Sequence, residues 1–318
     1  MTTATTTTVE TDTLGKRIYK RLSSVPSWAL WIIVAIWTLP SFSLLVNSFR
    51  GRQDQIADGV WTIVGNPSQF TTENYDIVLN RSGAGGLFDS LISSFAIAIP
   101  ATIIPISFAT FAAYAFAWID FKGREWLFIT TISLLAIPLQ VALIPLLTTY
   151  VGGAHQTIPF TERVITLIPD LDLNQQGAIA VWLTHTGFAM PFAIFLLHNY
   201  ITELPAEIFE SARLDGASHF TIFWRLVLPL SVPALAAFAI FQFLWTWNDF
   251  LIAITMLSGG NPVDLPTTVR IANLAGDFGL NEHLLPAGAF VQAFVPLVVF
   301  FSLQRYFVRG LLAGSVKG

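Results

Sequence analysis

Six apolar segments, each long enough to cross a bilayer, constrain the fold of this chain more than any other feature. About 20 consecutive apolar residues span the hydrocarbon core as a helix, and only helices or closed barrels satisfy their backbone groups there. The segments cover residues 28–46, 91–118, 126–147, 178–197, 230–257 and 286–303. They predict an all-α integral membrane protein with six transmembrane helices.

The composition supports a membrane protein and excludes several other classes. Hydrophobic residues make up 54% of the 318 residues and charged residues only 11%, whereas soluble domains carry about 25% charged residues. The net charge of −4 gives no basic surface for nucleic acid. The chain has no cysteine, which excludes disulfides and thiolate metal sites.

The distribution of Lys and Arg predicts the orientation, because cytoplasmic connections carry an excess of both. The termini and the connections on their side of the membrane hold eleven of the sixteen basic residues, and the opposite connections (49–90, 150–176 and 258–285) hold five. Both termini are therefore expected in the cytoplasm. Residues 14–22 form a basic segment that either binds anionic membrane lipid or only sets the topology.

We divide the chain accordingly into four parts. Residues 1–26 are a cytoplasmic leader that contains the basic segment, and 27–86 comprise the first transmembrane helix and an outward-facing loop. Residues 87–310 form a core with five transmembrane helices. A cytoplasmic tail follows at 311–318.

The connection at 210–229 is unusually charged for this chain, and it is expected in the cytoplasm. Pro205 suits the first turn of a helix, where its missing donor costs nothing. Leu204, Ile208 and Ala212 recur at helical spacing and predict an apolar face. Gly216 can end this helix in the left-handed conformation. A second helix is expected from there until Pro229 begins the next span.

The same connection carries a family resemblance. Glu210, Ser211, Ala212 and Gly216, followed by a closing Leu226-x-Leu228-Pro229, resemble the EAA loop of ABC-importer permeases. Two residues depart from that pattern, Ser211 for the usual alanine and Leu226 for the usual isoleucine, and both changes leave the helix and the turn feasible. The resemblance runs from about Leu87 to the C-terminus and is closest to the carbohydrate branch, in particular the maltose-type second permease.

The resemblance implies a type I ABC-importer permease bundle in the bacterial cytoplasmic (inner) membrane. It implies partnership with a second permease subunit, two ATP-binding subunits and an extracytoplasmic solute-binding protein, and import of a sugar or oligosaccharide of the α-glucoside type, such as maltose or trehalose. In that family the EAA helix seats in a groove of the ATPase. The residues expected to couple to the ATPase are therefore Glu210, Ser211, Ala212, Asp215, Gly216, Ala217 and Phe220. An amphipathic linker that only shields the bundle is the alternative.

No motif indicates chemistry in this chain. There is no G-x-x-x-x-G-K-[ST] sequence for ATP and no H-E-x-x-H, and the five histidines are scattered. We expect a transport subunit without cofactor or metal, with ATP hydrolysis in a partner chain. A permease for another solute, a stand-alone secondary transporter or channel, and an intramembrane enzyme are the alternatives.

Polar residues inside the spans are candidates for the translocation path, because polar groups in lipid are costly. The candidates are Gln140, Gln242, Asn248 and Asp249. The two glutamines are equally suited to interhelical hydrogen bonds, and Asn248 and Asp249 to ending a helix in water. Trp245 and Trp247 suit a sugar face or interface anchoring equally well. The tail residues Ser315, Val316, Lys317 and Gly318 either contact the ATPase pair or form a disordered end.

Overall fold

The computed structural model describes residues 26–81, 86–158, 163–257, 259–261, 264–274 and 281–313. The predicted leader, apart from Pro26, and the tail residues Ser315, Val316, Lys317 and Gly318 lie outside this range.

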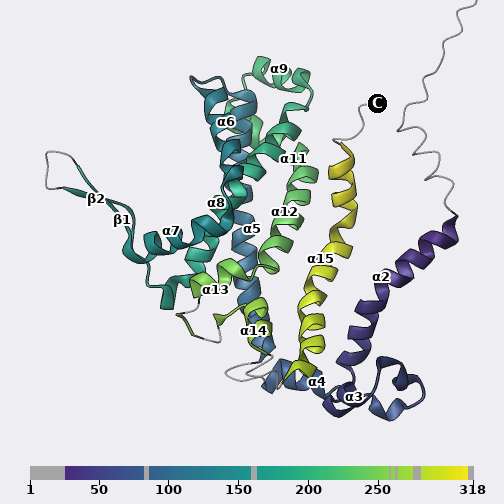
Figure 1. Cartoon of the computed structure of the whole chain (residues 1–318). Helices are drawn as coiled ribbons and strands as arrows, with labels where there is room; N and C mark the ends of the chain where they lie inside the picture. The colour runs from purple at the N-terminus through teal and green to yellow at the C-terminus, as the bar shows by residue number, and fades with distance from the viewer. Residues whose placement is uncertain are drawn as a thin grey trace, which may run out of the picture.

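The described chain is a bundle of long apolar helices, which confirms the predicted all-α membrane fold (Figure 1). Four helical segments are each long and apolar enough to cross a membrane. Two further pairs of helices are also long and apolar enough if each bent pair is counted as one span. The four are α2 (Ser27–Ser48), α5 (Leu87–Trp118), α8 (Leu173–Thr202) and residues 282–304, which include most of α15 (Leu285–Ala313).

Small side chains bring α5 and α8 together at the centre of the bundle. Ala109 and Ala113 of α5 are fully buried and pack with Ala189 and Ala193 of α8. Small residues allow close helix approach, and in lipid packing drives association. These alanines of the second span thus build the core of this chain.

The third expected span is broken rather than continuous. Helix α6 (Arg124–Ser133) and the 3-10 turn Leu134–Ala136 lead into Pro138, and α7 (Leu139–Gly152) leaves at 102° to α6. Pro138 has an extended backbone and precedes the first turn of α7. Proline lacks an N–H and clashes with a preceding helical turn, and here the helix ends at this position instead of continuing with a kink.

The fifth expected span is also divided. Helix α12 (Val232–Trp247) ends at Asn248, and α13 (Leu251–Leu257) begins after Asp249 and Phe250. At the other end of α12, the segment His219–Leu230 meets it at 68°. That segment comprises α10 (His219–Ile222), a π-turn (Phe223–Val227) and α11 (Leu228–Leu230). The helix therefore passes Pro229 and bends at Ser231, two residues later than predicted.

Short elements close the end of the bundle where α2 contacts α15. They are α3 (Arg52–Ala57), the 3-10 helices Val60–Val64 and Pro67–Gln69, α4 (Glu73–Asp76) and a π-turn (Ile77–Arg81). The fully buried guanidinium of Arg50 organises them. It donates to the Gln69 and Asn47 side chains at 3.2 and 3.0 Å and to the carbonyl of Asp54 at 2.8 Å.

Two later connections also contain short elements. The connection after α7 forms an antiparallel hairpin of β1 (Ala154–Thr157) and β2 (Val164–Ile168), which the sequence interpretation did not include. Helix α14 (Thr267–Leu274) and the 3-10 turn Glu282–Leu284 precede α15. Helix α2 diverges from α15 toward its Ser27 end (Figure 1), and none of its membrane window is buried. Its surface is thus available to lipid or to another subunit.

Candidate functional sites

The charged connection folds as a helix, a glycine turn and a second helix. Helix α9 (Ala206–Leu214) starts after Pro205, one residue later than predicted, and Gly216 has φ +78°. The amide of Ala217 donates to Ala212 at 2.9 Å and that of Gly216 to Arg213 at 3.0 Å. These two bonds are a Schellman C-cap. Gly216 therefore ends the helix in the left-handed conformation, as predicted.

A buried aromatic pair attaches α9 to the end of α5. Phe209 is 1% exposed and its ring stacks on Trp118 with centroids 4.0 Å apart. Of the three residues of the predicted apolar face, Leu204 and Ala212 pack against the core, whereas Ile208 is 38% exposed. Phe209 was not identified from the sequence as the residue that anchors α9, because the helical spacing used there runs through the adjacent Ile208. One sequence signal could have identified this anchor, because Phe209 is the only aromatic residue in α9.

Further bonds hold both arms of the loop on α5. Arg213 donates to the carbonyl of Trp118 at 3.3 Å, which caps the last turn of α5. In the second arm, the His219 ring lies 2.9 Å from the Tyr114 hydroxyl. The Phe223 ring stacks on Phe111 at 4.5 Å between centroids. The loop is thus fixed to the same helix that forms the centre of the bundle.

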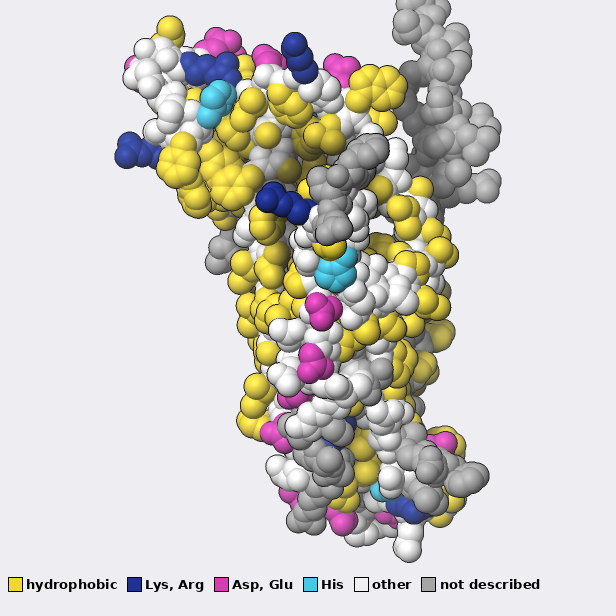
Figure 2. All heavy atoms as spheres, turned by 90° about the vertical axis from the view of Figure 1, so that its left-hand side faces the viewer, with side chains coloured by type: hydrophobic (Ala, Val, Ile, Leu, Met, Phe, Trp, Pro, Cys, Tyr) yellow, Lys and Arg dark blue, Asp and Glu magenta, His cyan; other side chains and the backbone are white. Residues whose placement is uncertain are grey.

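The outer surface of this loop combines acidic and large apolar side chains. Leu214 is 89% exposed, Phe220 72% and Trp224 46%. Glu207, Glu210, Ser211 and Asp215 are exposed beside them. The loop stands at one end of the bundle (Figure 1), and charged side chains crowd that end above a broad hydrophobic surface (Figure 2). Among the predicted coupling residues, only Ala212 and Ala217 are half-buried and pack inward.

The structure does not bring the four candidate path residues together. Gln140 is exposed near the start of α7. Gln242 is 1% exposed and donates to the carbonyl of Ala101 at 3.1 Å, which is the interhelical bond that the sequence left open. Asn248 ends α12 and its side-chain amide donates to the carbonyl of Leu244 at 2.8 Å.

Asp249 is buried rather than in water. Its side chain is 7% exposed and accepts from the amides of Ile252 and Ala253 at 3.4 and 3.0 Å, which caps α13. The fully buried imidazole of His185, on α8, lies 3.6 Å from the same carboxylate. A cavity of about 10 Å³, the size of one water molecule, lies among these groups. The break in the fifth span therefore lies beside a buried histidine of α8.

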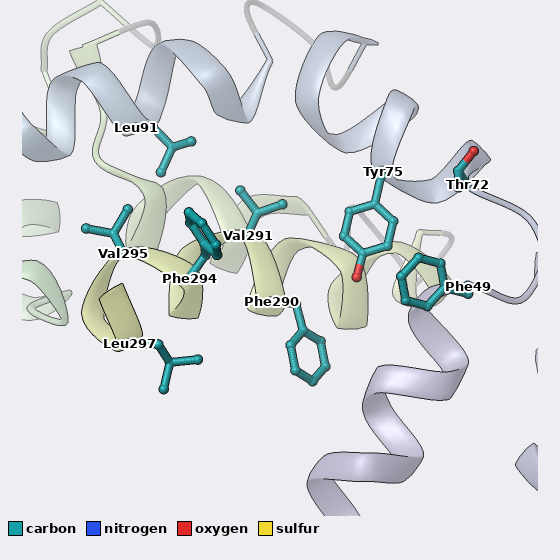
Figure 3. Close-up of a pocket in the computed structure, with 9 residues that line it drawn as sticks. All are labelled: Phe49, Thr72, Tyr75, Leu91, Phe290, Val291, Phe294, Val295 and Leu297. Carbon is teal, nitrogen blue, oxygen red and sulfur yellow. The ribbon is translucent and has the colours of Figure 1, made fainter. Parts of the chain in front are cut away.

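Among the larger grooves on the described surface, two lie along the membrane helices. The first, of about 510 Å³, lies between the end of α2, α4, α5 and α15 (Figure 3). Its wall is almost wholly apolar and carries the rings of Phe49, Tyr75, Phe290 and Phe294. Such a wall suits a hydrocarbon chain or another helix. The second, of about 430 Å³, lies beside the break in the third span, and Tyr150, Thr184 and Trp245 contribute to its lining.

A bundle of membrane helices with an exposed helix–turn–helix fixed at one end defines a multi-span membrane protein. The comparisons with known proteins name the family. The model of the "Binding-protein-dependent transport system inner membrane component" family matches residues 105–313. The chain belongs to this family of bacterial inner-membrane permeases, which confirms the predicted class, location and family.

Several curated relatives are similar over most of the chain. The osmoprotective compounds uptake permease protein GgtD of Synechocystis is 48% identical over 91% of this chain and 90% of its own length. The alpha-glucoside transport system permease protein AglG of Rhizobium meliloti is 48% identical over 86% of this chain and 68% of its own. The arabinooligosaccharides transport system permease protein AraQ of Halalkalibacterium halodurans is 31% identical over 94% of this chain and 99% of its own length.

A solved structure shows the same fold. A chain of a bacterial ABC transporter involved in the import of alginate matches with a TM-score of 0.67 at 19% identity, covering 93% of this chain and 98% of that one. The bundle is therefore that of a type I ABC-importer permease, as predicted.

Proposed function

We propose that the chain is one of two permease subunits of an ATP-driven sugar importer, and that it couples to an ATPase through α9, the Gly216 turn and α10. The main support for the coupling role is that Leu214 and Phe220 are exposed on this loop. The loop is fixed to α5 through the stacking of Phe209 on Trp118. Large exposed apolar groups rimmed by charges mark protein interaction sites. An amphipathic linker that shields the bundle would turn these side chains inward.

The proposed cargo is an α-glucoside or a related small sugar. Support comes from the 48% identity to a permease named for α-glucosides and from relatives named for oligosaccharides. The equally similar permease named for osmoprotective compounds makes a small osmoprotective solute a second candidate. Candidate cargoes therefore include maltose and trehalose.

The proposed assembly contains a second permease, two ATP-binding subunits and an extracytoplasmic solute-binding protein. The loaded binding protein and ATP-driven closure of the ATPases act on opposite ends of the bundle and bias two of its conformations. Alternating access follows because each ligand binds the two conformations with different affinity. In this proposal the chain supplies half of the pathway and performs no covalent chemistry.

We propose that the α9 end is cytoplasmic and that Ser315, Val316, Lys317 and Gly318 contact the ATPase pair. Helix α15 runs toward the end of the bundle that carries α9 (Figure 1), so its C-terminal end lies on the proposed ATPase side. Deletion of residues 316–318 should lower the yield of ATPase that copurifies with the permease. Unchanged transport and assembly would contradict the tail contact.

Reconstitution of the four-component importer in proteoliposomes tests the function. We expect uptake of labelled maltose or trehalose that needs both ATP and the binding protein. Glu210→Lys should reduce ATPase association and substrate-driven ATP hydrolysis together. Glu73→Lys, a change of the same kind in an exposed residue at the other end of the bundle, is the matched control. Uptake of a peptide or phosphate but no sugar would refute the proposed cargo, and intact coupling in Glu210→Lys would refute the proposed docking role.

A further inference from the structure

The groove beside the break in the third span has the features of a sugar subsite. Its volume of about 430 Å³ lies in the range of small-molecule pockets. Because α7 turns away at Pro138, the middle of α8 stays uncovered there, and Thr184, Gly187 and Phe188 line the groove. Gly187 is near the midpoint of the 30-residue helix α8. Transported solutes bind at such interruptions near the bilayer midplane in other transporters.

The indole of Trp245 distinguishes this groove from a plain helix-packing surface. In the described part of the chain, the N–H groups of Trp118, Trp182 and Trp247 each donate to a backbone carbonyl at 3.2 Å. The Trp245 N–H has no hydrogen-bond partner among the described residues. A tryptophan N–H that leaves bulk water normally finds an acceptor. Trp245 thus offers the groove both an aromatic face and a free donor.

The neighbouring groups suit a hydroxylated ring. Thr184 donates to the Tyr150 hydroxyl at 3.3 Å, so the Tyr150 hydrogen remains free to donate onward. Trp245 is held from behind by the buried His185 ring, edge to face at 5.2 Å between centroids. The groove thus combines the Trp245 ring, two hydrogen-bond donors and the open surface at Gly187. These features match a pyranose, whose C–H face packs on an aromatic ring while its hydroxyls accept hydrogen bonds. A partner helix would need none of these donors.

We propose that this groove is this subunit's subsite for one pyranose ring of the cargo during translocation, with Trp245 stacking on the sugar and Trp245 and Tyr150 donating to its hydroxyls. The inference rests on the proposed sugar importer.

Three variants of the complete importer test the proposal. Trp245→Phe keeps a ring but removes the donor, and the loss of one hydrogen bond predicts a roughly threefold to tenfold fall in sugar uptake. Gly187→Leu adds a side chain to the groove at a position where a Cβ meets nothing within 4 Å, and it should nearly abolish uptake. Gly152→Leu is the matched control, since its site is equally open but does not line the groove.

The readouts separate the possible results. Assembly with the partner permease and binding-protein-stimulated ATP hydrolysis should survive in Trp245→Phe and Gly187→Leu, while sugar moved per ATP falls. Unchanged uptake in both variants overturns the subsite. Loss of assembly along with uptake also overturns it, because the groove would then be a contact with the partner permease. If the unmodified importer carries no sugar at all, the proposed function fails first and the sugar subsite fails with it.

Discussion

Replacement of Phe209 by alanine should detach the coupling helix while leaving the bundle folded. Helix α9 has nine residues, and isolated helices shorter than about 12–15 residues are marginal in water. Its order therefore depends on packing. Removing a buried phenylalanine from a core costs about 3–5 kcal/mol, and Phe209 is the one fully buried side chain of α9. A loss of about 3 kcal/mol raises the local opening constant roughly a hundredfold.

Amide hydrogen exchange on the assembled importer measures this opening. Peptides covering residues 206–214 should exchange roughly a hundredfold faster in Phe209→Ala, and peptides from α5 should not change. Ile208→Ala is the matched control, because Ile208 is the adjacent, 38% exposed residue. Stimulation of ATP hydrolysis by the loaded binding protein should fall in Phe209→Ala only. Equal protection of 206–214 in both variants would refute the anchoring role of Phe209.

Three further changes test other parts of the structure. Gly216→Val places a β-branched residue at φ +78°, which costs about 1–2 kcal/mol. The yield of copurified ATPase should therefore drop in Gly216→Val but not in Gly216→Asn. Equal yields would contradict the role of Gly216 as a C-cap. Asp249→Asn weakens the charged cap of α13, and the assembled complex should lose roughly 1–3 kcal/mol of stability. Its melting temperature should fall, whereas Asn248→Asp, the control, should leave the melting temperature unchanged. Arg50→Met removes the guanidinium that joins α2 to α3, so residues 51–76 should exchange faster, while Arg52→Met, at an exposed site, should leave them protected.

The number and order of the spans could be predicted from the sequence because long apolar runs are a one-dimensional signal. The glycine turn was equally readable, since a left-handed C-cap strongly favours glycine. The breaks at Pro138 and Asn248 were not assigned. Proline occurs inside other helices here without ending them, as Pro100 and Pro105 do in α5. Whether a proline bends or breaks a helix depends on the neighbouring helices.

The contacts between distant residues could not be predicted, because no periodicity reports them. Phe209 meets Trp118 across 91 positions of sequence, and His185 meets Asp249 across 64. Gln242 was a candidate for the pathway until its partner, the carbonyl of Ala101, was known. The groove at Trp245 depends on the direction in which α7 leaves Pro138, and that direction is a property of the folded bundle.

Site-specific cross-linking tests the coupling role of α9 and α10 most directly. The chain has no cysteine, so a single cysteine at exposed Ser211 or Phe220 is a unique attachment point. In the assembled importer, cysteines at these two positions should cross-link to an ATP-binding subunit, and the yield should change between the ATP-bound and nucleotide-free states. A cysteine at Ile56, which is 76% exposed in α3 at the other end of the bundle, should not. Cross-linking of the ATP-binding subunit from Ile56 but from neither Ser211 nor Phe220 would contradict the account.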